Sequence, residues 1–187
     1  MVRSLSNSKI LACAVILLGF FLADSQHLAK PEPQNLAHPR PWVGYRAENS
    51  AWRIQFPEKP HIQESPEAPG YTFYVVGNDD ILFIFATFVP TYIGSRRQAE
   101  NEATLARRDQ GGRSFVVNTI GHNGTTGYQL DYIKTISGRN CIVRSRYFTS
   151  SFQGTSFTMN PKYLICNLGI KNDLLPMGER FLNSLQF

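Results

Sequence analysis

The chain has 187 residues, of which 42% are hydrophobic and 18% are charged. This composition supplies a core for one ordinary domain, excludes wholesale disorder and leaves little room for two full domains. The net charge of +5 is spread along the chain, which argues against a basic arm for nucleic acid. Three cysteines are too few for a disulfide-dense miniprotein or for a zinc site built from cysteines alone.

The N-terminus has the three parts of a secretory signal peptide. Residues 1–9 carry two positive charges and no acid, and residues 10–22 form an unbroken apolar run. As a helix this run would be about 20 Å long, shorter than a bilayer core of about 30 Å. A small-x-small site at 23–25 follows. We therefore predict a signal peptide at 1–25 with cleavage before Gln26.

The alternative is that the apolar segment is retained as a membrane anchor. A lipoprotein is disfavoured because the apolar stretch follows Cys13, whereas a lipobox requires it before the cysteine. Cleavage would remove Cys13 and lower the net charge from +5 to +4. We expect a mature protein without a stable membrane span, either periplasmic or secreted.

Residues 26–49 are expected to form a proline-rich linker, or a strap lying on the domain. Four prolines fall between positions 31 and 41. Proline fixes φ and removes an amide donor, so both helix and sheet are unlikely there. A single domain is then expected at 50–187.

The first half of this domain predicts strands. Apolar residues alternate at 52–56, and residues 61–69 are expected to form a loop. The runs at 71–76 and 81–89 are rich in aromatic and β-branched residues and flank a turn signal at 77–80, which predicts a hairpin. The second run is apolar on both faces, so we expect it in the middle of a sheet.

A helix is predicted next. Ser95 and Gln98 have the spacing of a capping box, and the pair Gly111-Gly112 would stop the helix. The predicted inner face is a stripe of small residues: Ala99, Ala103 and Ala106.

The second half again predicts strands, at 114–120, 128–136, 140–151 and 155–168. Turn signals separate them, and Pro161 inside the last run predicts a bulge or an edge position. The interpretation is an α+β domain, with an antiparallel meander of six or seven strands and helices packed on it.

A helix is also predicted at the C-terminus. Either Asn172 or Asp173 would cap it, with Pro176 in its first turn. The residues expected on its inner face are Met177, Phe181 and Leu185.

The run WRIQFPEKP at 52–60 and the run RFLNSL at 180–185 resemble the PsbP-like fold. Many secreted bacterial proteins of that kind open with a strand closing on Phe-Pro-x-Lys-Pro and end in Phe-Leu-x-Ser-Phe, where this chain has Leu185. The resemblance covers about residues 50–187 and implies an antiparallel sheet with helices on both faces. It also implies binding or assembly roles. It transfers no functional residue, because these proteins share no catalytic site.

Cys141 and Cys166 remain after signal cleavage and predict a disulfide. If Gln153 and Gly154 are the two loop residues of a hairpin, counting outward places the two cysteines directly opposite each other. Opposed residues in a non-hydrogen-bonded position lie within disulfide range. Two buried thiols are the alternative, and a bulge at Pro161 would shift the register.

No pattern for a metal, a cofactor or a known catalytic centre is found. The four histidines lack the spacing of a zinc site, and phosphate-binding and nucleophile motifs are absent from the sequence. We expect no cofactor. Asp79-Asp80 is interpreted as part of a turn.

Arginines form a candidate surface for an anionic partner. Arg144 and Arg146 alternate onto the same face of a strand, and the others flank the first predicted helix. The whole set is Arg96, Arg97, Arg107, Arg108, Arg144 and Arg146. A solvated face is the ordinary alternative, and aromatic residues do not interleave these arginines as a nucleic-acid platform requires.

We therefore expect an exported binding or accessory protein that acts through protein–protein interaction and is not an enzyme. The first alternative is a secreted enzyme that uses His61 or His122 with a carboxylate. The second is a small-ligand carrier with an apolar cavity.

Overall fold

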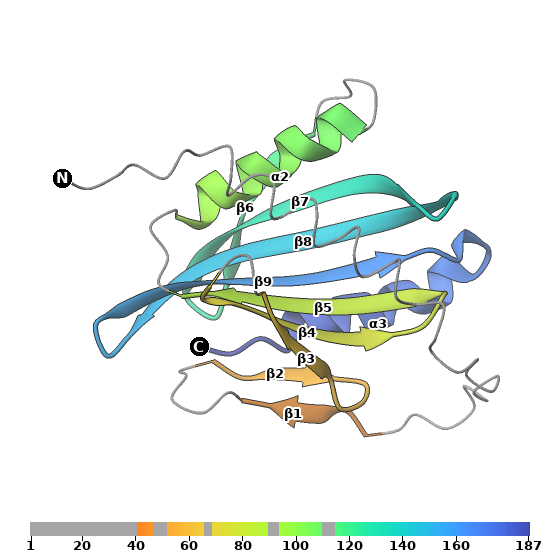
Figure 1. The fold of residues 1–187 in the computed structure, drawn as a ribbon. Helices are drawn as coiled ribbons and strands as arrows, with labels where there is room; N and C mark the ends of the chain where they lie inside the picture. Colours follow the sequence, from red (N-terminus) through yellow and green to blue (C-terminus); the bar gives the residue numbers. More distant parts are fainter. Residues whose placement is uncertain (1–40, 47–51, 66–68, 90–93, 110–114) are drawn as a thin grey trace.

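The computed structural model of the chain describes residues 41–46, 52–65, 69–89, 94–109 and 115–187. Figure 1 shows one large twisted sheet with a helix on each side and a two-stranded sheet next to it. The predicted signal peptide at 1–25 lies outside the described residues.

The large sheet has seven antiparallel strands in the order β3-β4-β5-β9-β8-β7-β6. These are β3 (His61–Glu64), β4 (Tyr71–Gly77), β5 (Ile81–Phe88), β6 (Val117–His122), β7 (Thr125–Ile136), β8 (Arg139–Phe152) and β9 (Thr155–Ile165). The predicted α+β class is confirmed, and β5 lies inside the sheet as its two apolar faces indicated. Strands adjacent in sequence are neighbours within β3–β5 and within β6–β9, and β9 joins the two groups by pairing with β5.

Two segments expected to lack sheet structure contain strands. Inside the predicted linker, β1 (Val43–Tyr45) pairs with β2 (Ile54–Phe56), so the expectation that this stretch forms no sheet was wrong for β1. Trp42 and Tyr45 also pack against the core. The start of the predicted loop at 61–69 is instead the edge strand β3, which pairs with β4.

Three two-residue turns set the register of β6 to β9. The first residue of each turn has a positive φ, and glycine follows in the same left-handed region: Asn123-Gly124, Ser137-Gly138 and Gln153-Gly154. Turns of this kind match the right-handed twist of the strands they join. The last one pairs Phe152 with Thr155, as the sequence predicted.

Pro161 lies in the interior strand β9, so the expected edge or bulge was wrong. The register between β8 and β9 is the same on both sides of this residue and places it opposite Arg146. Proline has no N–H to donate to the Arg146 carbonyl. The side chain of Asn160 fills the gap, because its Nδ2 donates to Arg146 O at 2.7 Å.

Helix α2 (Ser95–Asp109) and helix α3 (Lys171–Asn183) cover opposite faces of the sheet (Figure 1). Helix α2 contacts β6, β7 and β8 and buries its three alanines, and α3 contacts β9, β5 and β2. The 3-10 turn η2 (Leu168–Ile170) leads into α3, which begins without a side-chain cap. Pro176 therefore lies inside α3 and not in its first turn, contrary to expectation.

The main core lies between the sheet, α3 and the β1–β2 pair. Its largest fully buried side chains include Phe56, Phe83, Phe85 and Phe181. Gly178 lets α3 approach the sheet closely, because a Cβ there would lie 2.7 Å from the Tyr163 ring.

Candidate functional site

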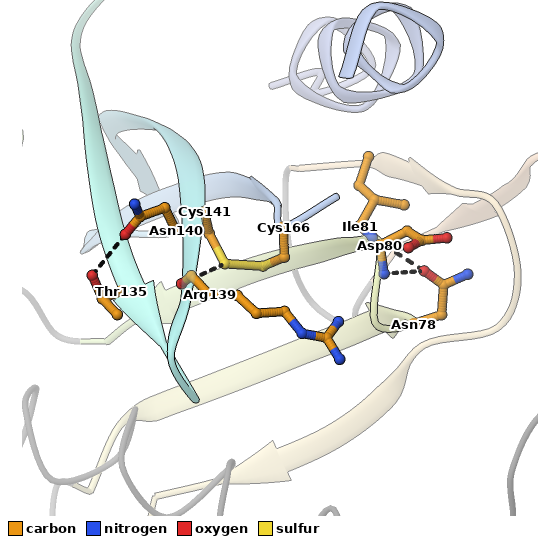
Figure 2. The surroundings of a disulfide bond; sticks show 8 residues. All are labelled: Asn78, Asp80, Ile81, Thr135, Arg139, Asn140, Cys141 and Cys166. Carbon is orange, nitrogen blue, oxygen red and sulfur yellow. Dashed lines mark hydrogen bonds between the residues drawn. A yellow bond between two sulfur atoms is a disulfide. The ribbon is translucent and has the colours of Figure 1, made fainter. Parts of the chain in front are cut away.

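The disulfide closes one end of the β8–β9 hairpin (Figure 2). Cys141 and Cys166 are joined, with their Cα atoms 4.1 Å apart, at the position that the turn register predicted. The chain after the bridge is held by the β4–β5 turn, since Cys166 N donates to Asp80 O at 2.8 Å and Asn167 Nδ2 donates to Asp80 Oδ1 at 2.9 Å. Asp80 therefore ties this turn to the segment entering α3.

Under α2 lies a buried polar cluster centred on Glu102, whose side chain is 12% exposed. Lys162 Nζ on β9 and Tyr132 Oη on β7 each donate to Glu102 Oε1 at 2.6 Å. Ser145 Oγ on β8 donates to Oε2 at 3.0 Å, and Tyr147 Oη donates to the same oxygen. Four donors from three strands thus converge on one carboxylate of the helix.

The two charges of the cluster balance, because the Glu102 carboxylate pairs with the Lys162 ammonium. Burial alone would raise the pKa of Glu102, but the positive charge of Lys162 and the hydrogen bonds it receives hold that pKa below its ordinary value. Burial, together with the negative charge of Glu102, raises the pKa of Tyr147 well above its ordinary value. Glu102 is therefore a carboxylate and Tyr147 a neutral donor at neutral pH, which fixes α2 on the sheet.

The other side of α2 is basic and exposed. Arg96 and Arg97 each have side chains 73% exposed and share the carboxylate of Glu100. Arg107 and Arg108 are exposed in the last turn. These four residues define what we call the α2 arginine surface.

The remaining two arginines of the predicted surface lie on the opposite face of the sheet. Arg144 Nη1 donates to Glu179 Oε1 of α3 at 2.5 Å, and Arg146 Nη2 donates to Glu179 Oε2 at 3.2 Å. Arg144 Nε also donates to Asp131 Oδ1 at 2.6 Å. Strand alternation sends these side chains away from Ser145 and α2. The two arginines share a face as predicted, but the structure does not bring them together with the α2 arginine surface.

The two histidines named for an enzyme lie apart from any catalytic arrangement. His61 is exposed on the edge strand β3. His122 Nε2 donates to Leu185 O at 2.6 Å, and its ring packs against Phe148 and Phe187. Within the described ranges, neither histidine forms an ion pair with a carboxylate.

The sequence interpretation missed the Glu102 cluster, although the signal was present. Glu102 follows Ala99 by three residues and directly precedes Ala103, so the helical period places it on the buried stripe. A carboxylate on such a stripe requires a cation and donors from the sheet. Lys162, inside a strand with buried neighbours, was the available partner.

In the described part of the chain, no group of three or more histidine, cysteine, aspartate or glutamate side chains that could hold a metal ion occurs. None of the helices described there is long and apolar enough to cross a membrane.

No model of a known protein family matches the chain, and no curated protein matches it. Solved structures give weak likenesses. LpqN of Mycobacterium tuberculosis, described as involved in cell envelope biogenesis, is 14% identical with a TM-score of 0.41 over 81% of this chain and 86% of LpqN. The Ran-binding protein Mog1p of Saccharomyces cerevisiae is 8% identical with a TM-score of 0.44 over 79% of this chain and 95% of Mog1p. PA94 of Pseudomonas aeruginosa, a protein of unknown function described as a putative regulator, is 12% identical with a TM-score of 0.42 over 78% of this chain and 96% of PA94. These small sheet proteins are similar in layout and assign no function to this chain.

Proposed function

We propose that this chain is an exported accessory protein of the cell envelope or the secreted fraction, and that it binds another protein through the α2 arginine surface. The observation that carries the proposal is the two-sided character of α2. Its inner side is fixed by the buried Glu102 cluster, and its outer side presents four exposed arginines.

Arginine suits this role because its planar guanidinium binds a carboxylate through two parallel hydrogen bonds. Glu100 is shared between Arg96 and Arg97, while Arg107 and Arg108 are exposed at the other end of the helix. The surface therefore favours an acidic protein, and a helix anchored to the sheet presents its arginines with little loss of conformational entropy.

The predicted signal peptide and the Cys141–Cys166 disulfide support an oxidising compartment for this function. Export is tested by cell fractionation and N-terminal sequencing of the accumulated protein. A mature chain starting at Gln26 in the periplasm or the medium is expected. Accumulation of the uncleaved chain in the cytoplasm would contradict the proposal.

The binding surface is tested with charge-reversal variants of the tagged full chain. Arg107→Glu combined with Arg108→Glu should abolish capture of proteins from the envelope and medium fractions. The matched control combines Lys59→Glu with Arg139→Glu, which gives the same change in net charge at exposed positions outside α2. Capture of the same proteins by both variants would contradict the role of α2, since only the first removes arginines from this surface.

A further inference from the structure

The two edge strands of the large sheet differ in how well they are protected against pairing with a strand of another chain. The β3 edge has only four residues, includes Glu64, and follows Pro57 and Pro60 closely. Short edges, charges and prolines are the usual means of preventing another strand from pairing. The β6 edge, with the sequence VNTIGH, has six residues and contains neither proline, lysine nor acid.

The turn before β7 determines which main-chain groups of β6 face outward. In a two-residue hairpin the residues flanking the loop, here His122 and Thr125, form a hydrogen-bonded pair, and such pairs recur at every second residue. The N–H and C=O groups of Val117, Thr119 and Gly121 therefore point away from β7. In the described part of the chain no main-chain partner for these groups is found, and Thr119 and Gly121 are exposed.

A strand added to this edge would contact different chemistry on its two faces. On the α3 side it would lie next to Val116, the most exposed large apolar residue of the described chain at 69%, because alternation along the strand places Val116 on the same face as Ile120, which packs against the main core. On the other side it would lie next to α2, which contacts β6. An incoming strand that alternates β-branched and acidic residues would match both faces.

A second copy of this chain is a poorer occupant. Antiparallel pairing of β6 with its own copy is related by a two-fold axis perpendicular to the sheet, which keeps corresponding faces on the same side. The two α2 helices, each of which contacts β6, would then lie on one face near the junction and bring two sets of exposed arginines of the same charge close together. Like charges at a contact oppose association, whereas carboxylates on a different chain would be attracted.

We propose that the β6 edge binds an extended, acidic segment of another polypeptide as an eighth, antiparallel strand, with its acidic side chains toward α2 and its β-branched side chains toward Val116. The inference rests on the proposed function and specifies the chemistry of the partner. Main-chain hydrogen bonds to Val117, Thr119 and Gly121 would hold the segment, and the arginines of α2 would select its charge.

The test uses the full chain and an end-blocked peptide of about eight residues that alternates glutamate with valine. Amide exchange measured by NMR should slow about tenfold or more at Val117, Thr119 and Gly121 when the peptide is present. Two N-methylated peptides provide the chemical control, one methylated at its odd-numbered residues and the other at its even-numbered residues. Only one of the two should lose binding, because only every second amide of the added strand faces β6.

Thr119→Pro removes one outward N–H without touching a bond to β7, so the strand is expected to survive and peptide affinity to fall about tenfold or more. Thr119→Val keeps the amide and should bind like the parent chain. Equal affinity for Thr119→Pro, binding by both methylated peptides, or absence of binding by the peptide series would each overturn the proposal.

Two other results would overturn the β6 site in distinguishable ways. If binding of the peptide requires Arg107 and Arg108 but does not slow exchange of the β6 amides, the peptide binds the α2 arginine surface and not the edge of the sheet. If the β6 amides become protected with rising protein concentration and no peptide, the occupant of the edge is a second copy.

Discussion

Glu102→Gln should destabilise the fold strongly, because it removes the only carboxylate that contacts the buried Lys162 ammonium in the described structure. The Lys162 side chain is 9% exposed, so the variant leaves a cation with little access to water. Glutamine also replaces one acceptor oxygen by an NH₂ group. Each oxygen of Glu102 accepts from two donors, so the amide NH₂ must face either the Lys162 ammonium, which can only donate, or two hydroxyls that would have to turn in order to accept.

Removing one partner of a buried ion pair costs about 3–5 kcal/mol, and we expect this range for Glu102→Gln. Urea unfolding, followed by circular dichroism and by the fluorescence of the buried Trp52, measures it. The matched control is Glu100→Gln on the exposed side of α2, whose cost should stay below about 0.5 kcal/mol. Lys162→Met added to Glu102→Gln should recover part of the loss, because the unpaired charge is then removed. A cost below about 1 kcal/mol for Glu102→Gln would refute the reasoning.

The same cluster predicts a pH dependence. The pKa of Glu102 is lower in the folded chain than its ordinary value, so its contribution to stability is complete above the unfolded-state pKa of about 4.3. That contribution is lost as the pH falls through the lower folded-state pKa. The parent chain should therefore lose stability on acidification below about pH 4.3, and Glu102→Gln should show a shallower loss over that window.

Three further changes have defined outcomes. Gly178→Ala should lower the urea midpoint, at a cost of about 1–3 kcal/mol from the clash with Tyr163, although alanine favours helix by about 1 kcal/mol. Thiol titration of the unreduced, unfolded chain should leave Cys141 and Cys166 unreactive, and replacing both by alanine should cost about 3 kcal/mol for this loop length. Asn160→Ala should cost about 1–3 kcal/mol in urea unfolding, because a carbonyl of β8 loses its side-chain donor.

Prediction of the structure from the sequence was most accurate where a local feature, such as a tight turn, determines the geometry of the chain. Gln153-Gly154 is a two-residue turn, and counting outward from it placed Cys141 opposite Cys166 without information from elsewhere in the chain. The apolar faces of residues 81–89 likewise predicted an interior strand, because burial on both sides leaves no polar alternation.

Prediction failed where a distant or neighbouring side chain changes the local rule. Pro161 signalled an edge because proline lacks an amide, but Asn160 supplies the missing donor and the strand stays interior. The proline-rich stretch around Val43–Tyr45 signalled a linker, yet it pairs with a strand formed eleven residues later. The six arginines were grouped by neighbourhood in sequence, whereas strand alternation and the two helices divide them between opposite faces.

Both helices are held by the same device, and this decides where positive charge remains for a partner. Glu102 of α2 receives Lys162, and Glu179 of α3 receives Arg144 and Arg146. A tyrosine hydroxyl of the sheet also donates to each glutamate, which adds direction to the charge pairing. These three cations are therefore paired with carboxylates within the fold, and that pairing competes with the binding of an external anion. The arginines of α2 are exposed and their ion pairs lie at the surface, so their loss should alter binding while leaving stability close to that of the parent chain.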